Sequence, residues 1–314
     1  MFTIQRMTPD RKTEVANLIR DSTNDWYQQH LGYELFDSGS ESTMLFCDVY
    51  ESLDPGCCLI AVSDRDESIL GSCFYHPRET HFSLGIMNVR GDVFGQGVAR
   101  ALLNEICELA DLQQKPVRLV SSAMNLDSFS LYNRAGFVPR HVFQDMVLSV
   151  PTSGLEYEAS RPDRIRVATT QDIQSMGDLE EKIAGIRRDR DYRFFVNAGA
   201  MDCQKKDVAD WHVSVLYEGN ELKGWLVSVV HPASCMVGPG IASDESTALT
   251  LLHHELNHRK GQRMVFLVPV ECQKIIRTAY AWGARNCEIH LAQSRGPSQP
   301  FAGIVFPTFM PETG

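Results

Sequence analysis

A glycine-rich segment in the first half of the chain carries the clearest chemical signal. Residues 85–103 read GIMNVRGDVFGQGVARALL: an expected strand leads into a loop with Gly95 and Gly97, and a helix follows at once. Glycines at such a turn let a ligand approach the main chain closely. The free N–H groups at a helix start, with the positive end of the helix dipole, bind anions. The segment therefore predicts a phosphate-binding turn.

Two familiar phosphate motifs do not fit this segment. A dinucleotide fingerprint requires glycine or alanine where Arg100 stands, and an acidic residue about 20 positions on, where the apolar stretch VRLV lies. A P-loop requires Gly-Lys-Ser/Thr, which the sequence does not contain. The glycine loop is therefore neither of these.

A second chemical motif, HELNH, lies in the second half of the chain. On a helix, His254 and His258 share a face suited to zinc, and Glu255 is placed to activate water. Against this, Met264 stands where a metzincin has its third histidine, and the apolar strand that begins there requires the helix to end by Gly261. A zinc hydrolase is therefore the weaker alternative, and no metal is expected.

Composition and charge exclude several classes of protein. The chain has 314 residues, enough for two domains, with 43% hydrophobic and 22% charged residues, as in globular proteins. A net charge of -10 argues against a nucleic-acid surface. Residues 1–150 hold 12 basic and 20 acidic residues, which slightly favours a cationic substrate.

The sequence also indicates the cellular compartment of the protein. No run approaches the roughly 18 apolar residues of a membrane span, and the charged N-terminus does not read as a signal peptide. The nine cysteines form no CxxC pair and are expected to be reduced. We expect a cytoplasmic protein with no membrane partner.

The elements that position the glycine loop follow from hydrophobic periodicity. Strands are expected at 3–6, 57–63, 69–75, 82–89 and 117–121, and helices at 9–20, 97–112 and 126–135. Residues 138–150 form one long strand or a strand pair, and residues 21–55 receive no assignment. The loop thus lies between the fourth of these strands, at 82–89, and an amphipathic helix.

After a Pro- and Gly-containing linker at 151–164, the order of elements repeats. The hairpin ending GSCFYHP recurs as GWLVSVVHP, and the helix that ends at Gly136 recurs as one that ends at Gly283. The predicted fold class is therefore α+β (mixed α/β). Two tandem units, residues 1–150 and 165–314, each form a mixed, mostly antiparallel sheet flanked by helices.

The whole pattern resembles the GNAT acetyltransferase superfamily. The family's acetyl-CoA motif has the form Val-x-Pro-x-x-Arg/Gln-Gly-x-Gly-x-Gly/Ala, and a later helix ends Leu-Tyr-x-x-x-Gly-Phe. The residues that match are Val89, Gly95, Gly97, Ala99, Asn125, Leu131, Tyr132, Gly136 and Phe137. The sequence departs from the motif at Gly91, in place of proline, and at Phe94, in place of Arg/Gln.

The resemblance implies a binding site for acetyl-CoA as acyl donor. The implied cofactor-binding residues are Met87, Asn88, Val89, Phe94, Gly95, Gln96, Gly97, Val98, Ala99, Arg100 and Asn125. The family places the pantetheine arm between the splayed fourth and fifth strands, with a main-chain N–H on the thioester carbonyl. Tyr132 takes the role of catalytic acid toward the departing thiolate.

The resemblance leaves the base and the acceptor open. Candidates for the base lie in HPRETH: His76, Glu79 and His81. Residues where the family builds its substrate wall are Asp21, Asp25, Trp26 and Tyr27, suited to a cationic amine. Solvated loop charges and an ordinary helix face remain the alternative interpretations.

The second copy has lost the chemistry of the first. Where the first unit has its glycine loop, the second reads ASDES at 242–246, whose two acids would repel a pyrophosphate, and Ala279 aligns with Tyr132. The second unit is expected to be a non-catalytic GNAT-like module.

The resulting functional prediction is an N-acetyltransferase. It moves an acetyl group from the CoA thioester to a primary amine of a small molecule or peptide by direct attack. The alternatives are a CoA-binding regulatory or interaction protein with little turnover, and the zinc hydrolase. The identity of the acceptor and the oligomeric state stay open.

Overall fold

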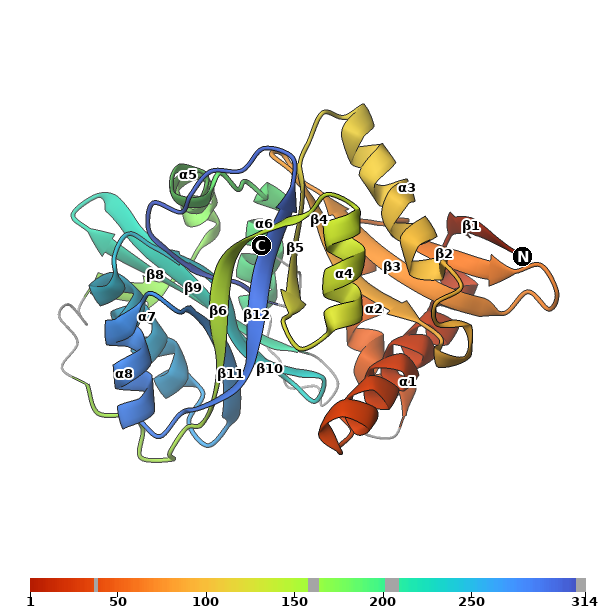
Figure 1. Cartoon of the computed structure of the whole chain (residues 1–314). Helices are drawn as coiled ribbons and strands as arrows, with labels where there is room; N and C mark the ends of the chain where they lie inside the picture. The colour runs from red at the N-terminus through yellow and green to blue at the C-terminus, as the bar shows by residue number, and fades with distance from the viewer. Residues whose placement is uncertain (37–38, 158–163, 201–208, 309–314) are drawn as a thin grey trace.

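The computed structural model describes residues 1–36, 39–157, 164–200 and 209–308 (Figure 1). The first half contains β1 (Phe2–Arg6), α1 (Lys12–Leu31), α2 (Ser40–Leu53), β2 (Cys58–Ser63), β3 (Ile69–Pro77), β4 (Phe82–Val89), α3 (Val98–Leu112), β5 (Val117–Ser122), α4 (Leu126–Arg134) and β6 (Val138–Ser149). None of the described helices combines the length and apolar character that a membrane crossing needs.

The second half repeats this order of elements. It contains β7 (Ile165–Val167), α5 (Ile173–Ala184), α6 (Asp189–Gly199), β8 (Asp210–Glu218), β9 (Glu221–His231), β10 (Ser234–Ala242), α7 (Glu245–His258), β11 (Arg263–Pro269), α8 (Gln273–Ala281), β12 (Arg285–Arg295) and β13 (Ile304–Phe306). The predicted mixed α/β fold with two similar units is confirmed.

Most of the described part of the unassigned stretch 21–55 is helical. The first helix continues to Leu31 and ends at Gly32, whose φ of 79° lies in the left-handed region that favours glycine. The second helix of the pair follows as α2. Residues 138–149 form one strand, so the alternative of a strand pair there is wrong.

Within the described residues the strands form one continuous 13-stranded sheet. Its order is β1-β2-β3-β4-β5-β12-β6-β11-β10-β9-β8-β7, with β13 added beside β10. From one end the order is β1 to β5 and then β12, and from the other end it is β7 to β11 and then β6. The equivalent strands of the two halves therefore follow in the same order from either end. Internal duplication is therefore visible in the topology as well as in the sequence.

The two halves exchange their last long strands. All six residues of β5 pair antiparallel with β12, from the second half, while β6, from the first half, pairs antiparallel with both β12 and β11. Figure 1 shows β5, β12 and β6 side by side where the halves meet. Each half therefore completes its sheet with a strand of the other, and residues far apart in the sequence become neighbours.

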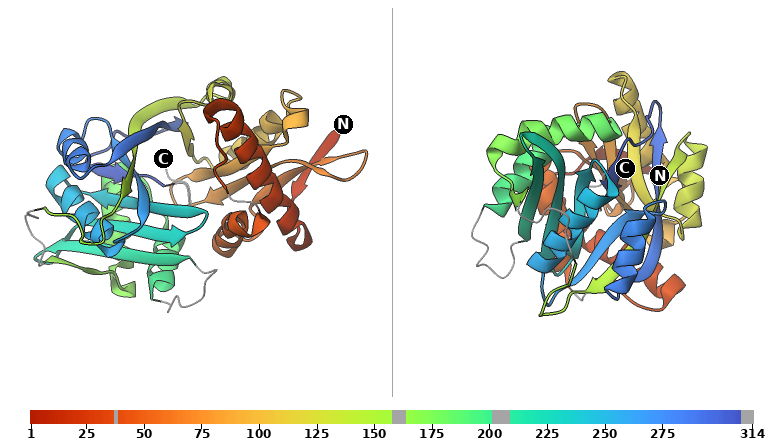
Figure 2. Two further views of the ribbon diagram at one scale, coloured as in Figure 1. Left: turned by 90° about the horizontal axis from the view of Figure 1, so that it is seen from below. Right: turned by 90° about the vertical axis from the view of Figure 1, so that its left-hand side faces the viewer.

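Helices cover both faces of this sheet. On the face of α1, α2, α5 and α6, one apolar cluster contains Tyr50 and Phe74 of the first half and Trp211 and Trp225 of the second. Helices α3 and α4 cover a separate cluster, and α7 and α8 a third. Figure 2 shows α1 lying across the first half of the sheet. Because one core spans both halves, the interface between them is built like a domain interior.

A buried charge network also joins the halves. Arg78, at the end of β3, lies 2.8 Å from Asp54 and 2.7 Å from Asp191, which belongs to α6. Arg190 of α6 reaches Asp54 at 3.1 Å. Buried charges are stable only when paired and hydrogen-bonded, so this network fixes the position of one half against the other.

Candidate functional site

A pocket of about 650 Å³ opens where β4 and β5 diverge. The two strands pair in parallel only at Phe82–Val117 and Ser83–Arg118, and beyond that point they separate. Met87, Asn88 and Val89 keep their pairing with β3 but have no strand partner on the β5 side among the described residues. Unpaired main-chain groups along a pocket wall are suited to bind an extended ligand as an added strand would.

The sequence-predicted cofactor residues meet in this pocket. Met87, Asn88, Val89, Phe94, Gly95, Gln96, Gly97, Val98, Ala99, Arg100 and Asn125 all line it. They come from β4, the glycine loop with the start of α3, and the start of α4. The volume lies in the usual range for ligand pockets, about 300–1,000 Å³. Their role in holding a cofactor stays a prediction.

The glycine loop has the backbone that its sequence implies. Gly95 and Gly97 have φ values of 76° and 88°, in the left-handed region that other residues enter only at a cost. Gly97 is the N-cap of α3, and in the described part of the chain no side chain caps the start of this helix. Its first N–H groups therefore face the pocket region without a side-chain acceptor, which suits an anion. Phe94 is 62% exposed and contributes an apolar edge to the same wall.

Asparagines on two sides of the pocket are held by local hydrogen bonds. The Asn125 side chain accepts from Ser128 N at 3.0 Å and so caps α4. Asn88 donates from Nδ2 to Ser22 Oγ at 2.7 Å, which ties β4 to α1. Its Oδ1 atom is buried and has no hydrogen-bond partner among the described residues. Asn88 thus lines the pocket and carries a buried acceptor without a donor.

Tyr132 lies close to the pocket but does not line it in this structure. It is 7% exposed, and its ring centroid is 5.7 Å from that of Phe137. Its neighbours Leu131 and Ala135 are part of the pocket wall. The structure thus places the tyrosine beside the pocket, within the core under α4, and its acid role stays a prediction.

Only two of the four residues predicted to form the substrate wall line the pocket. Trp26 and Tyr27, near the end of α1, line the pocket. Asp21 and Asp25 are exposed, and Asp21 lies 2.6 Å from Arg20. The aromatic pair therefore belongs to the site, while the two acids point to solvent.

None of the base candidates in HPRETH lines the pocket. His76 is buried, with Nδ1 2.8 Å from Asp54 Oδ2 in the network between the halves. His81 is buried beside Ser83, with Nε2 3.1 Å from Oγ. Glu79 Oε2 accepts from Asp189 N at 3.4 Å. These residues belong to the interface of the two halves.

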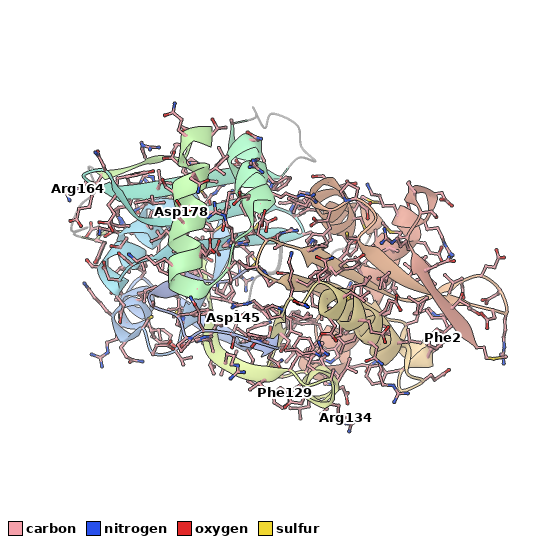
Figure 3. All side chains as sticks on the ribbon, turned by 90° about the horizontal axis from the view of Figure 1, so that it is seen from above. Phe2, Phe129, Arg134, Asp145, Arg164 and Asp178 are labelled. Carbon is pink, nitrogen blue, oxygen red and sulfur yellow. The ribbon has the colours of Figure 1, made fainter. Side chains whose placement is uncertain are left out.

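Sequence reasoning missed a cluster beside the pocket. Asp145 of β6 meets Glu288 and His290 of β12, and one side-chain atom of each lies within 4.8 Å of the others. His290 Nδ1 lies 2.9 Å from Asp145 Oδ2, and the Tyr27 hydroxyl donates to Glu288 Oε2 at 3.2 Å. Figure 3 labels Asp145 where the two halves meet. No sequence signal points to it, because its residues are about 140 positions apart and meet only through the strand exchange.

The cluster has unusual electrostatics. Burial raises the pKa of Asp145, and the imidazole of His290 offsets part of this rise. Burial also raises the pKa of Tyr27, and the Glu288 carboxylate raises it further, so the phenol stays protonated. Tyr33 lies against Tyr27 with ring centroids 5.6 Å apart. The surroundings of the two carboxylates are aromatic and partly buried.

The second half closes the equivalent of the pocket with its own residues. Strands β10 and β11 pair in parallel only at Met236–Val265 and Val237–Phe266, and they then diverge as β4 and β5 do. The strand β13 pairs antiparallel with residues 240–242 of β10 and takes the space between them. Asp244 caps α7 by accepting from Thr247 N at 2.9 Å. Chain atoms therefore occupy both places where a cofactor would bind.

The HELNH motif has a structural role in the described part of the chain. Glu255 is fully buried, 3.0 Å from His212 Nδ1, and accepts from Ser228 Oγ at 2.6 Å. Burial is the largest single effect and opposes its ionisation, but the hydrogen bonds from His212 and the neighbouring serines, together with the charge of His212, hold the pKa of Glu255 below its ordinary value. Among the described residues, His254 and His258 are in no cluster tight enough to share an ion. The geometry does not support a zinc hydrolase.

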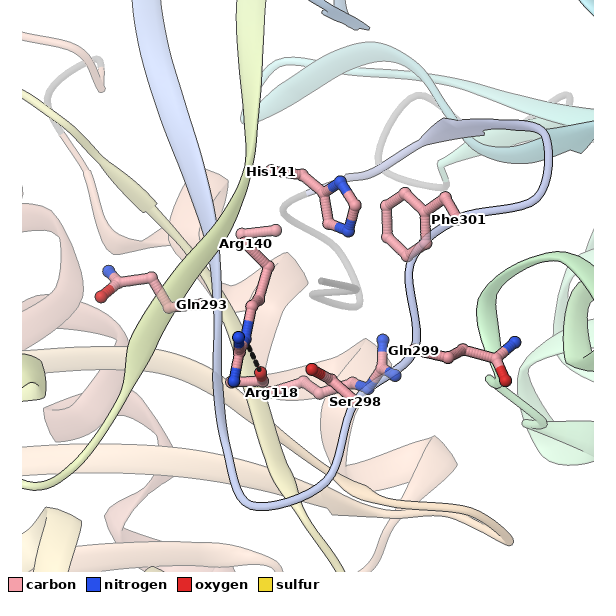
Figure 4. A pocket seen from close by; sticks show the side chains of 9 residues that line it. Arg118, Arg140, His141, Gln293, Ser298, Gln299 and Phe301 are labelled. Atoms are coloured by element: carbon pink, nitrogen blue, oxygen red, sulfur yellow. Dashed lines mark hydrogen bonds between the residues drawn. The ribbon is translucent and has the colours of Figure 1, made fainter.

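A second hollow, shown in Figure 4, is too small for a substrate. Arg118, Arg140 and His141 line it, and His141 stacks on Phe301 with ring centroids 3.7 Å apart. Its volume of about 10 Å³ leaves room for about one water molecule. The larger pocket is the candidate active site.

Comparisons with known proteins agree with this geometry. Residues 14–137 match the sequence model of the acetyltransferase (GNAT) family. No curated protein matches the chain. A candidate acetyltransferase from Pyrococcus horikoshii is 15% identical, with a TM-score of 0.72 over 99% of this chain and 95% of that one. A GCN5-related N-acetyltransferase from Sphaerobacter thermophilus is also 15% identical, with a TM-score of 0.61 over 96% and 98%.

A tandem protein shares the two-unit layout. A tandem GNAT protein from the clavulanic acid biosynthesis pathway is 12% identical, with a TM-score of 0.59 over 95% of this chain and 100% of that one. At these identities the structural likeness extends to the fold alone.

Proposed function

Because the first half of this chain is a domain of the GNAT acetyltransferase family, we propose that the protein transfers an acetyl group from acetyl-CoA to a primary amine. The observation that carries the proposal is the pocket between β4 and β5. Its wall joins the glycine loop, the start of α3 and the unpaired edge of β4.

Acetyl-CoA fits this wall by its chemistry. The pyrophosphate would lie on the N–H groups after Gly95 and Gly97, at the positive end of the α3 dipole. The pantetheine arm would lie along Met87 to Val89, whose main chain has no strand partner on that side. The arm carries two amides, and these can pair with an exposed strand edge. The thioester would then lie near the point where β4 and β5 begin to diverge.

The reaction follows from this placement. The amine nitrogen attacks the thioester carbonyl carbon, and a main-chain N–H of β4 stabilises the charge that develops on oxygen. The C–N bond forms, the C–S bond breaks, and its electron pair goes to sulfur. Tyr132 would give its proton to the thiolate and take one from the nitrogen of the new amide. The products are the acetylated amine and free CoA.

In this proposal the second half serves the first without binding a cofactor of its own. The strand β13 and the Asp244 cap occupy the positions that correspond to pantetheine and pyrophosphate. Its exchanged strand β12 completes the sheet beside β5. The second half therefore acts as part of the catalytic unit's framework.

Thermal unfolding with and without acetyl-CoA is the first test. A ligand at about 100 times its dissociation constant stabilises the folded state by about 2.7 kcal/mol, which raises the midpoint by several degrees. Release of free thiol with a panel of primary amines then measures turnover. No shift at millimolar acetyl-CoA would contradict the proposal.

A second candidate is a CoA-binding protein with little turnover. It is favoured by Phe94, an exposed apolar side chain where the family motif has a polar one, and by Tyr132, which does not line the pocket. An acetyl-CoA-dependent shift without thiol release from any amine would select this second candidate.

A further inference from the structure

The cluster of Asp145, Glu288 and His290 adjoins the pocket at two points. Ser122 lines the pocket at the end of β5 and pairs directly with His290 on β12. Tyr27 lines it from α1 and donates to Glu288. The cluster therefore lies directly behind the pocket wall, on the side of α1 and the exchanged strands, and its three residues do not themselves line the pocket.

Among the described residues, neither carboxylate of the cluster pairs with an arginine: Asp145 pairs with the imidazole of His290, and Glu288 accepts from the hydroxyl of Tyr27. Asp54, Glu180 and Asp191 each pair with an arginine. Asp145 is only 2% exposed, and its Oδ1 has no hydrogen-bond partner among the described residues. The same holds for Oε1 of Glu288. A buried acceptor without a donor is costly, so the arrangement calls for a ligand that donates.

A primary ammonium group meets this requirement. It carries one positive charge and three N–H donors, enough to reach two carboxylates at once. The rings of Tyr27 and Tyr33 stand beside Glu288, and aromatic faces attract organic cations while covering the adjoining alkyl chain. A hydrated metal ion would gain nothing from these rings. The chemistry of the cluster thus favours an alkyl ammonium.

We propose that Asp145 and Glu288 bind the ammonium group of the acceptor, so that the acceptor is a cationic primary amine and both halves of the chain build its site. The inference rests on the proposed acetyl transfer. The acidic residues expected from the sequence for this purpose, Asp21 and Asp25, are exposed elsewhere on α1.

The same cluster prepares the amine for attack. One proton passes from the ammonium nitrogen to the carboxylate of Asp145, which leaves a neutral amine with a free electron pair. Burial raises the pKa of Asp145, which makes it a better proton acceptor than a solvated aspartate. His290 lies against the other oxygen, so the accepted proton can be shared within the pair. The proton leaves to solvent after the product departs.

The test uses two nearly isosteric variants, Asp145→Asn and Glu288→Gln, with Glu108→Gln as control. Glu108 is an exposed carboxylate on α3 outside the pocket wall. Thiol release is followed with butylamine, phenethylamine, spermidine and lysine amide as acceptors. We expect the KM for amines to rise about ten- to hundredfold in the two variants, as for loss of a charged hydrogen bond, with the KM for acetyl-CoA unchanged. The control should match the wild type.

Folding of the variants is checked by thermal unfolding. Each variant removes one charge from a buried pair without an arginine, so its midpoint should equal or exceed that of the wild type. Amine KM values within about twofold of the wild type in both variants would overturn the inference while leaving the proposed acetyl transfer intact.

Calorimetric titration separates the two proposals further. Spermidine and butylamine are titrated into the protein without acetyl-CoA. Binding that is lost in both variants supports the inference even if no thiol is released. Failure of every amine to bind the wild type at about 10 mM would overturn it. So would binding of Mg²⁺, Mn²⁺ or Zn²⁺ that depends on the two carboxylates and excludes spermidine.

Discussion

Replacing Gly95 with alanine tests the glycine loop most directly. At a φ of 76° an alanine enters the left-handed region, which costs about 1–2 kcal/mol. A Cβ at this position meets no atom within 4 Å, so the cost is backbone strain alone. Gly219, in the turn between β8 and β9, has a φ of 60° and equally open space. Gly219→Ala is therefore a control with similar strain far from the pocket.

The two variants should differ in their response to acetyl-CoA. The added methyl of Gly95→Ala stands on the pocket wall and holds the pyrophosphate away from main-chain N–H groups. Loss of one charged hydrogen bond, about 1.5 kcal/mol, raises the dissociation constant about tenfold. At a concentration that stabilises the wild type by about 2.7 kcal/mol, this variant gains about 1.4 kcal/mol.

Differential scanning fluorimetry measures both effects. Without ligand, both variants should unfold a few degrees below the wild type. With acetyl-CoA, Gly219→Ala should regain the full wild-type shift and Gly95→Ala about half of it. Equal shifts in the two variants would refute the assignment of the pyrophosphate to this loop, whatever the fold.

Three further outcomes are expected. Tyr132→Phe should lower turnover about 10²- to 10⁴-fold but keep the rise of the unfolding midpoint with acetyl-CoA. The control Tyr280→Phe, on the corresponding helix α8, should keep both the turnover and the rise of the midpoint. Unchanged thiol release in Tyr132→Phe would refute the acid role. Glu255→Ala should destabilise the protein by about 3–5 kcal/mol because it leaves His212 and Ser228 without their buried partner, yet acetyl-CoA binding should persist; a stable variant without binding would contradict the structural role. Burial holds the pKa of His81 well below its ordinary value, so the folded state keeps it neutral while the unfolded chain takes up a proton below about pH 6.5. The unfolding free energy therefore falls by about 1.3 kcal/mol between pH 7 and pH 5.5 because of this residue. Urea unfolding at the two pH values should show a fall that is smaller by this amount in His81→Asn than in the wild type.

The sequence by itself determined the proposed cofactor side of the site. The glycine loop, its preceding strand and its following helix are contiguous in the sequence, so the backbone conformation of each depends mainly on its own residues. Gly95 and Gly97 take the left-handed conformation that their residue type allows, and the expected strand at 82–89 matches β4 residue for residue. Residues predicted to hold the cofactor therefore line one pocket. Duplication was equally readable, because each unit repeats its order of elements.

Only the tertiary structure decided the proposed acceptor side. Hydrophobic patterns predict strand structure within residues 138–150, but not which strand will be its neighbour. Exchange of β6 and β12 brings Asp145 to Glu288 and His290, and places them beside Tyr27 of α1. The position of β13, whose three residues fill the gap between β10 and β11, was likewise decided only by the tertiary structure. Pairing over such separations depends on the register of the whole sheet, and no local sequence pattern carries that register.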